Sequence, residues 1–530
     1  MYAIDSIYVI RYLLLPFLGL LASGAVFFLV HKNLPADYPG RPAAGLEGRL
    51  RLVFVSFLVI YALYFFSTII LRYYTHHLAF FDFGVYDWRI WRIHAVPWAR
   101  WPEKIASSLE GHFQPVLVLY SFLYDLGAGP VVLNILQGLA VFSGVFPLYL
   151  IARKRLEGRG LVYAVTALYL LYPATQFNMA IDFHPDHLVI PLFFWSYYLV
   201  ERGCIRLVFL PAIAAYAIKE PYILAFAFFG IYMAWDKKRV AAGAVLFTLS
   251  MTVFFITTFF ISSSLADYQH IETITGKVAY GYLFEHGRLS LIMREVLDFR
   301  KWRFPFFILS PLLFIPLAGF RALVPALPLL AVQMLSTVAH HQSVGSQYTA
   351  GFIAPVFVSF VAVAGCIGER FGRRALISIL AAVFVITAFL NVAHSPSPLA
   401  VAFWKGGWSH GRWHYTNYLP GKNFDNINSA IDLVPEAPDF RVVTHSLIYN
   451  KRLAHRYSYS PFPERWRKAD FIILDNSLEP YVSDSIDEGR YRKNLADLSG
   501  NREFSLIYKK GSVILYRRRS YEARDRDGAH

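Results

Sequence analysis

Charged residues and cysteine are both scarce in this chain of 530 residues. Lys, Arg, Asp and Glu together make up 16% of it, against about 25% in a typical soluble domain. Two cysteines, Cys204 and Cys366, give no disulfide framework, and the sequence has no G-x-x-x-x-G-K-S/T loop for ATP-driven chemistry. Hydrophobic residues instead reach 56%, and the mean hydropathy is +0.41. These proportions exclude a soluble globular enzyme, a disordered chain and a fibrous protein.

The hydrophobic residues are gathered into runs of about 20, the length that an α-helix needs to cross a bilayer. The runs do not alternate with polar residues, which argues against a porin-like barrel. The 46 Phe and 34 Tyr residues suit the aromatic belts of such helices. We therefore predict an α-helical polytopic membrane protein with about twelve transmembrane helices. Their predicted ranges are 8–30, 50–72, 129–152, 160–179, 187–203, 205–219, 221–236, 240–262, 304–320, 322–338, 350–368 and 375–394.

Basic residues predict the orientation of these helices, because short cytoplasmic loops of membrane proteins are rich in Lys and Arg. The basic segments 153–155, 237–239 and 370–374 fall in alternate loops, and we place them in the cytoplasm. The loop 73–128 and everything after about residue 394 then lie outside the plasma membrane. The net charge of +15 is explained by topology and lipid-headgroup contact rather than by nucleic-acid binding. The predicted partner is membrane lipid.

Two apolar segments need a separate interpretation. The stretch 112–126 would reverse the orientation of the basic loop at 153–155 if it crossed the membrane. We therefore expect a juxtamembrane or re-entrant helix on the outer face. The first 30 residues have Arg11 as their only early basic residue, and no clear small-x-small cleavage site precedes the charged loop. A retained span is the expectation there, rather than a signal peptide.

The composition changes after about residue 394, where no long apolar run occurs. Short strands are predicted at 440–444 and 471–474, followed by a hairpin over 504–517. We therefore expect a small C-terminal α/β extracytoplasmic domain. The predicted organisation is an N-terminal helix with a cytoplasmic loop (1–49), a transmembrane domain (50–394, with the outer loop 73–128), the α/β domain (395–516) and a charged, disordered tail (517–530).

Polar residues in or beside apolar helices are costly, and they are the first candidates for function. Asp82 and Asp87 lie in the aromatic outer segment FFDFGVYDWRIW, where a turn at Gly84 can bring both to one pocket. A carboxylate among aromatic residues at a membrane interface tends toward a raised pKa, which suits a general base for a hydroxyl acceptor. The alternative is that both carboxylates cap an amphipathic helix and face water.

The segment DFHPDH places Asp182 and His184 in a turn between two predicted spans. A divalent metal ion is compatible with these ligand types, but the spacing matches no standard zinc pattern, so the cofactor stays unknown. A binding or catalytic role without metal is one interpretation. A polar turn with a helix-capping aspartate is the other.

Lys219 and Glu220 stand between two short apolar spans, where an ion pair is costly without a purpose. Lysine is a natural point-charge partner for phosphate, and the alternative is a lysine that snorkels to the interface from a helix end. His341 and Tyr348 follow in a short outer loop, and His112 opens the juxtamembrane helix. Isolated histidines are more often structural than ligands. These histidines share the predicted outer face with the carboxylates.

Six segments of the chain occur in an order that can be recognised. They are FDFGVYDWRIW, HFQPVLVLYSFLYDLG, PLYLIARKRL, DFHPDHLVIPL, KEPYILAFAFFGIYM and HHQSVGSQYTAGFIAP. This order resembles the domain-of-unknown-function 2079 family of prokaryotic membrane proteins, from about residue 50 into the C-terminal domain. The chain departs from the family at Lys219-Glu220-Pro221, where members usually have Lys-Glu-Asp.

That family in turn looks similar to GT-C glycosyltransferases. These have a long acidic first outer loop, an interfacial segment and a span with a basic inner end, here Leu150 to Arg153. GT-C enzymes transfer a sugar from a polyprenyl-phosphate carrier, with a loop carboxylate as base and basic residues against the phosphate. Carried to this chain, the resemblance implies a GT-C-like fold, a base at Asp82 or Asp87, a phosphate contact at Lys219, and substrate contacts at His184 and His341.

The predicted function is a membrane glycosyltransferase of the extracytoplasmic face whose partner is a polyprenyl-phosphate-linked sugar. The predicted substrate-binding residues are His112, Asp182, His184, Lys219, Glu220, His341 and Tyr348. The alternatives are a transporter or flippase of lipid-linked or polar solutes, which could use the same charges as a path, and a non-catalytic membrane scaffold. No repeated halves, which many transporters show, are evident. One outer pocket open to lipid favours transfer, whereas a polar path to the cytoplasm favours transport.

Overall fold

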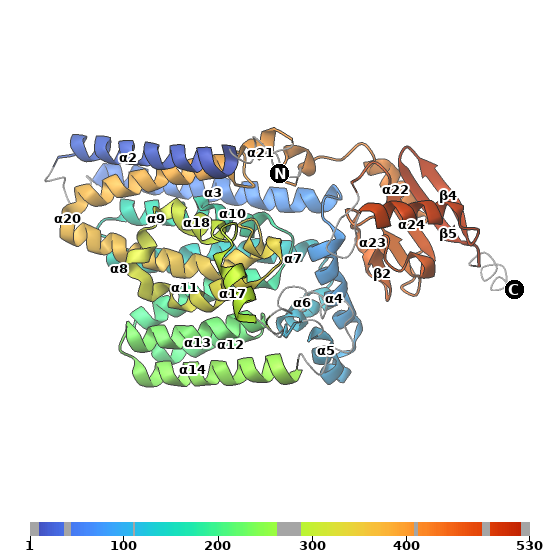
Figure 1. Ribbon diagram of the computed structural model, residues 1–530, viewed down its shortest axis with the longest axis horizontal. Coiled ribbons are helices and arrows are strands. Elements are labelled where there is room, and N and C mark those ends of the chain that lie inside the picture. Colours follow the sequence, from blue (N-terminus) through green and yellow to red (C-terminus); the bar gives the residue numbers. More distant parts are fainter. Residues whose placement is uncertain are drawn as a thin grey trace.

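The computed structural model describes residues 10–35, 44–109, 112–261, 283, 288–406, 412–479 and 488–520. Most long helices lie side by side along one direction, and a small sheet-containing unit sits at one end of this bundle (Figure 1). We call the described part of 412–520 the C-terminal unit. This arrangement agrees with the predicted class, a polytopic helical membrane protein with a small C-terminal α/β domain.

The helices of the bundle follow the apolar runs of the sequence. They are α2 (Leu15–Asn33), α3 (Ala44–Tyr74), α7 (Val131–Ser143), α8 (Val145–Arg155), α9 (Arg159–Leu171), α10 (Pro173–Ala180), α11 (Val189–Glu201), α12 (Phe209–Tyr216), α13 (Glu220–Trp235), α14 (Val240–Phe255), α17 (Arg288–Leu297), α18 (Arg303–Leu309), α19 (Leu327–Leu335) and α20 (Ala350–Ala393). Three short helices precede α7, namely α4 (Val85–Ala95), α5 (Trp101–Ser108) and α6 (Val116–Asp125). The apolar stretch at 112–126 therefore forms a short helix, α6, that packs against α4.

Six helical segments of the described residues are long and apolar enough to cross a membrane. They are Ile10–Asn33, Gly45–Tyr74, Val131–Arg155, Val240–Ile261, Ile315–Leu335 and Gln347–Ala393. Shorter apolar helices occur at Val116–Asp125, Arg159–Leu171, Ile205–Tyr216 and Glu220–Trp235. Apart from Val116–Asp125, each of these segments overlaps one or more of the predicted spans. Several predicted spans are divided or joined in the structure.

The divisions have local causes. Pro173 starts α10 after Tyr172 adopts an extended backbone, so the predicted span 160–179 consists of two helices. Gly372 has a φ of 80°, which separates the two halves of α20 where two spans were predicted. Leu313 and Phe314 have φ values of 52° and 58° between α18 and the next helical segment. No glycine marks this last turn, although Pro311 and Pro316 flank it.

The predicted basic loops and the C-terminal unit lie at opposite ends of α3. Arg159 forms an ion pair of 3.0 Å with Glu47 at the first end of this helix. Beyond its other end, His76 bonds to Asn428 of the C-terminal unit at 2.7 Å. The helix between them is 31 residues long, which corresponds to about 46 Å at 1.5 Å per residue. We call the two ends of the bundle the basic end and the domain end.

The middle of the bundle is filled with aromatic rings. Phe193 of α11 stacks on Phe226 of α13, with ring centroids 4.7 Å apart. Tyr169 of α9 meets Phe357 of α20 edge to face at 5.6 Å. All four side chains are fully buried. This apolar layer separates the polar groups of the domain end from those of the basic end.

The C-terminal unit contains a five-stranded sheet in the order β2-β1-β3-β5-β4. Its strands are β1 (Val442–Thr444), β2 (Tyr459–Pro461), β3 (Phe471–Asp475), β4 (Phe504–Lys510) and β5 (Val513–Arg518), and its helices are α22 (Phe424–Asp432), α23 (Lys451–Ala454) and α24 (Glu488–Gly500). The strands β2, β1 and β3 are parallel, and β5 and β4 join them antiparallel. The strands predicted from the sequence are present, including the hairpin, and only the three-residue β2 was missed. A short helix, α21 (Val401–Trp404), lies between α20 and this unit.

Backbone and side-chain contacts dock the C-terminal unit onto the segment after α3. The amide of Phe80 donates a hydrogen bond to the backbone oxygen of Ser446 at 2.7 Å. The indole nitrogen of Trp88 in α4 donates to the backbone oxygen of Arg456 at 2.8 Å. The unit is therefore held against the same outer segment that carries Asp82.

Candidate functional site

Polar residues from four distant segments come together at the domain end. Asp82 lies just before α4, Asp186 lies in the turn between α10 and α11, Lys219 precedes α13, and Tyr348 precedes α20. Tyr348 is within electrostatic range of the other three residues. The structure thus brings together motifs that are separated by more than 260 positions in the sequence.

Asp82 is the accessible carboxylate of this group, with 38% of its side chain exposed. It lies in a single π-helical turn, Phe80–Gly84, with a φ of 67°. Aspartate tolerates this left-handed conformation better than most residues do. The turn directs one carboxylate oxygen to within 3.3 Å of the Nε2 atom of His184. Asp82 is therefore a carboxylate with one cationic neighbour and a face open to solvent.

The pKa values of this pair move in opposite directions. Burial acts against ionisation of Asp82, but His184, Arg412 and His340 together lower its pKa to about 2. Burial likewise acts against a charged His184, but Asp82 raises the pKa of the imidazole above its ordinary value of 6.5. The Nδ1 atom of His184 bonds to the backbone oxygen of Asp182 at 2.9 Å. The raised pKa that the sequence suggested for Asp82 is therefore wrong, because aromatic surroundings matter less than the imidazolium beside it.

Lys219 is held by a second carboxylate that is deeper in the protein. Its ammonium nitrogen lies 4.0 Å from Asp186 and 5.9 Å from the centre of the Tyr348 ring. The hydroxyl of Tyr222 donates to the same Asp186 oxygen at 2.9 Å, and the other oxygen has no hydrogen-bond partner among the described residues. A separation of 4.0 Å is longer than a hydrogen bond, so the ammonium group can donate to another anion.

Asp186 was not selected from the sequence, although it stands in the DFHPDH segment. Asp182 was selected, and the structure shows it engaged elsewhere. Arg72 donates to one oxygen of Asp182 at 2.7 Å, and Arg412 lies 3.3 Å from the other. Asp182 therefore holds the turn that presents His184. The sequence does show Asp186, because it stands in the same polar segment four residues after Asp182. Nothing in that segment says which of the two carboxylates faces the site.

Glu220 and His112 secure the entry to α6. Glu220 accepts a hydrogen bond from the amide of Phe113 at 2.7 Å, and the Nδ1 atom of His112 lies 3.3 Å from its second oxygen. Next to them, Gln114 accepts from Arg89 of α4 at 2.8 Å. These contacts tie the start of α6 to the start of α13 and to α4. The predicted substrate contacts at Glu220 and His112 therefore border the site and fix its wall.

His341 packs against Tyr348, with ring centres 4.6 Å apart. Its Nδ1 atom lies 2.6 Å from the hydroxyl oxygen of Ser336, which itself accepts from the amide of Val338. Ser336 therefore fixes the orientation of the imidazole beside Tyr348. Burial, followed by the charges of His340 and Lys219, lowers the pKa of His341 to about 3. His341 is thus a neutral neighbour of the Lys219 group.

Asp87 faces away from this group and is completely buried. It accepts hydrogen bonds from Tyr124 at 2.6 Å and from Tyr449 at 2.7 Å. The Nε2 atom of His455 lies 3.0 and 3.1 Å from its two oxygens. Two of these partners belong to the C-terminal unit, so Asp87 joins that unit to α4 and α6. The turn at Gly84 therefore does not bring Asp82 and Asp87 to one pocket.

The DFHPDH segment carries carboxylates and imidazoles, which are ordinary metal ligands. Within the described residues, no group of three or more His, Cys, Asp or Glu side chains is arranged to hold a metal ion. Both nitrogens of His184 face protein oxygens, since Nδ1 contacts a carbonyl oxygen and Nε2 contacts Asp82.

The helices and the group of buried charges at their ends define a polytopic membrane protein. Residues 72–515 match the family described as predicted membrane protein, DUF2079. The chain belongs to this family, and the resemblance stated from the sequence is confirmed. No curated protein matches the chain.

The solved structures that are similar to the chain include two of one protein. A crystal structure of ArnT from Cupriavidus metallidurans bound to undecaprenyl phosphate has a TM-score of 0.48 and 11% sequence identity, and the match covers 90% of this chain and 98% of that one. The apo structure of the same protein has a TM-score of 0.48 and 12% identity, with 88% and 98% covered.

Proposed function

We propose that the chain is a membrane glycosyltransferase that moves a sugar from a polyprenyl-phosphate-linked donor to an acceptor at the extracytoplasmic face. The observation that carries the proposal is that Tyr348 lies within electrostatic range of both a partly exposed carboxylate, Asp82, and a buried cation, Lys219, at one end of the helices. Glycosyl transfer from a phosphate needs a base for the acceptor and a positive charge for the leaving group. The motif resemblance to GT-C enzymes assigns the same two roles.

The reaction balances with these two groups. Asp82 accepts the proton of the acceptor hydroxyl while that oxygen forms a bond to the anomeric carbon of the sugar. The bond between this carbon and the donor phosphate oxygen breaks, and its electron pair stays on the phosphate. Lys219 stabilises the charge that develops there. A pKa of about 2 keeps Asp82 ionised at neutral pH, so it is available to accept a proton, although as a weaker base than a carboxylate of ordinary pKa.

The remaining residues position these two groups. His184 orients Asp82 through their 3.3 Å contact, and Asp186 holds Lys219 near the surface of the Tyr348 ring. Tyr348 is within electrostatic range of both Lys219 and Asp82, so a substrate between them would contact it. Asp87 takes no part in the reaction in this scheme, because its oxygens are occupied by two tyrosines and a histidine.

The aromatic layer supports transfer over transport. The stacked rings of Phe193 and Phe226 lie in the first half of α11 and of α13, between the Lys219 group and the charged residues of the basic end. A solute path would have to pass through fully buried apolar side chains. Within the part of the chain that the structure describes, the exposed side of Asp82 lies at the domain end, which fits an enzyme that takes its donor from the membrane boundary.

The proposal places residues 395–516 and the domain end outside the plasma membrane. The C-terminal unit lies opposite the basic loops along α3, and basic loops favour the cytoplasm. In a variant without Cys204 and Cys366, a cysteine at Asp439 should react with a membrane-impermeant thiol reagent in intact cells. A cysteine at Lys237 should not react. Labelling at position 237 alone would reverse the orientation.

Activity is tested with purified protein and radiolabelled polyprenyl-phosphate sugars. Wild-type protein should transfer or release label, and Asp82→Asn should abolish this, because the amide keeps the shape but cannot accept a proton. Asp439→Asn, an exposed carboxylate of the C-terminal unit, is the matched control and should retain activity. Full activity of Asp82→Asn would reject the assignment of the base.

A further inference from the structure

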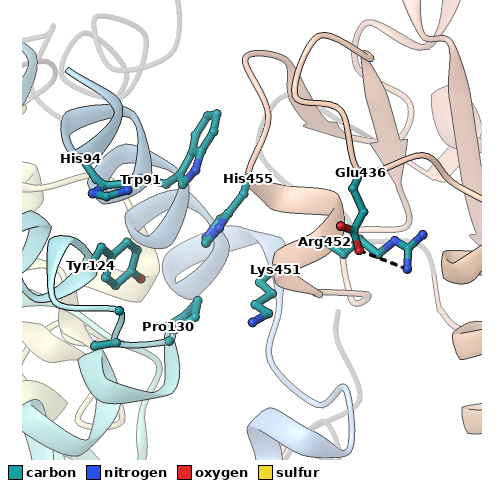
Figure 2. Close-up of a pocket in the computed structure, with 11 residues that line it drawn as sticks. Trp91, His94, Tyr124, Pro130, Glu436, Lys451, Arg452 and His455 are labelled. Carbon is teal, nitrogen blue, oxygen red and sulfur yellow. Dashed lines mark ion pairs between the residues drawn. The ribbon is translucent and has the colours of Figure 1, made fainter. Parts of the chain in front are cut away.

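A cavity of about 490 Å³ lies between the helical bundle and the C-terminal unit. Figure 2 shows Trp91, His94 and Tyr124 on one side, facing Lys451 and His455 on the other. The volume lies in the range of small-molecule sites, about 300–1,000 Å³. Neither Asp82 nor Lys219 lines it, so it is separate from the site proposed for transfer.

The helix α4 forms the wall between the cavity and the Asp82 site. Asp87, Trp91 and His94 are spaced at i, i+4 and i+7, which places them on one face of the helix. This face meets the cavity and the C-terminal unit. Tyr86 and Arg89 lie on a different face, where Tyr86 packs on His184 with ring centres 5.2 Å apart. The cavity and the Asp82 site are therefore lined by different faces of α4.

The cavity presents positive charge. The ammonium group of Lys451 has no ion pair or hydrogen bond among the residues that the structure describes, and Figure 2 shows it pointing into the space between the two parts. His94 uses its Nδ1 atom on Asp125 at 2.6 Å, and His455 uses its Nε2 atom on Asp87 at 3.0 Å. Each imidazole keeps its other nitrogen for a ligand, because a carboxylate already occupies the first.

The negative charge of the lining is already neutralised. Glu436 lies 3.5 Å from Arg452, the pair that is marked in Figure 2. Arg452 also donates to the backbone oxygen of Val434 at 3.0 Å, so it is fixed at the rim. Lys451 is left as the uncompensated charge of the cavity.

The position of the cavity places it at membrane-boundary depth. Residues 127–130 form one wall and lead directly into the span Val131–Arg155. Leu126, which precedes this wall, is an exposed apolar residue. A ligand in the cavity therefore lies at the level where lipid headgroups meet water.

We propose that this cavity binds a phosphate ester, with the phosphate against Lys451 and the organic part over Trp91 and Tyr124. Phosphate suits a lysine that acts as a point charge with donors around it. The cavity is larger than a phosphate alone requires, which calls for the organic part. The same chemistry occurs in soluble phosphate esters and in lipid headgroups, and the inference does not depend on the proposed transfer reaction.

Calorimetric titration of the purified full chain tests the proposal. The probes are glycerol 3-phosphate and dioctanoyl phosphatidic acid, with glycerol as the uncharged control. Wild-type protein should bind at least one phosphate probe saturably and should not bind glycerol. Lys451→Met should weaken this binding about 10-fold or more, because a charge-assisted contact is lost. Lys493→Met, an exposed lysine of α24 outside the cavity, should bind as wild type does.

The two probes separate the sources of the ligand. Similar affinity for both assigns the cavity to soluble esters, and binding of phosphatidic acid alone assigns it to a lipid headgroup. The proposal is overturned if neither probe binds, if Lys451→Met binds as wild type does, or if Lys493→Met loses as much affinity. Binding that Lys219→Met removes and Lys451→Met retains would place the phosphate in the other site and would also overturn it.

Discussion

Replacing Asp87 with asparagine should loosen the C-terminal unit without affecting the groups that surround Asp82. The Asp87 carboxylate is completely buried and receives the hydroxyls of Tyr124 and Tyr449 at 2.6 and 2.7 Å, together with His455 at 3.0 Å. An amide of the same shape loses the charge and offers only one oxygen as acceptor. At least one of the three donors is then left without its acceptor in a buried place.

The magnitude follows from these contacts. One hydrogen bond to a charged group contributes about 1.5–3 kcal/mol, and removing one partner of a buried ion pair costs about 3–5 kcal/mol. A loss of about 3 kcal/mol in docking free energy is therefore expected for Asp87→Asn. At about 1.4 kcal/mol for each factor of ten, the undocked population should rise about 100-fold.

Hydrogen exchange measures this population at a defined place. The amide of Phe80 donates across the interface to Ser446 at 2.7 Å, so the peptide that contains Phe80 should exchange about 100-fold faster in Asp87→Asn. Asp439→Asn, on the surface of the same unit, should exchange as wild type does. Unchanged exchange in Asp87→Asn would refute the docking role and return Asp87 to the candidates for the base.

Three further predictions concern other parts of the structure. Lys219→Met should weaken binding of a polyprenyl phosphate about 10- to 100-fold, whereas Lys219→Arg should keep part of it, and equal binding by both variants would contradict the phosphate contact. The ion pair of Asp82 and His184 contributes most between the unfolded pKa values of 3.8 and 6.5, because its folded values lie at about 2 and above 6.5. That contribution is lost as the pH falls through about 2 or rises through the raised value. The difference in melting temperature between wild type and Asp82→Asn should therefore shrink from pH 6 toward pH 9, and a constant difference would argue against the pair. A methyl group at Gly230 would approach a backbone oxygen of α14 to 2.5 Å, so Gly230→Ala should destabilise by about 1–3 kcal/mol, while Gly24→Ala, which has open space around it, should leave the melting temperature unchanged.

The helices could be predicted because their signal is local. The length of an apolar run and the charges at its ends depend only on neighbouring residues, and most of the predicted spans coincide with helices for that reason. Breaks that carry a local mark, such as Pro173, are visible in the sequence as well. The left-handed turn at Leu313 and Phe314 is flanked by Pro311 and Pro316, but its two residues are not ones that favour a positive φ, so the conformation itself could not be predicted.

The sequence indicated where the candidate site lies, but not which carboxylates face it. Polar residues among apolar ones are easy to find, and most of those selected do gather at the domain end. Which carboxylate faces the site depends on partners far away in the chain, since the tyrosine and histidine of the C-terminal unit that hold Asp87 are 362 and 368 positions from it. Asp182 was selected instead of Asp186 for the same reason. The arginines that hold Asp182 lie in segments remote from it in the chain.

The helix α4 lies between the cavity and the Asp82 site and forms a wall of both. This has a thermodynamic consequence. A ligand that stiffens or shifts α4 from the cavity side changes the free energy of the other face, which lies beside Asp82. By linkage, a substrate at Asp82 then changes the affinity of the cavity by the same factor. The C-terminal unit, which holds α4 through Asp87, is thereby in a position to adjust the membrane site according to what it binds itself.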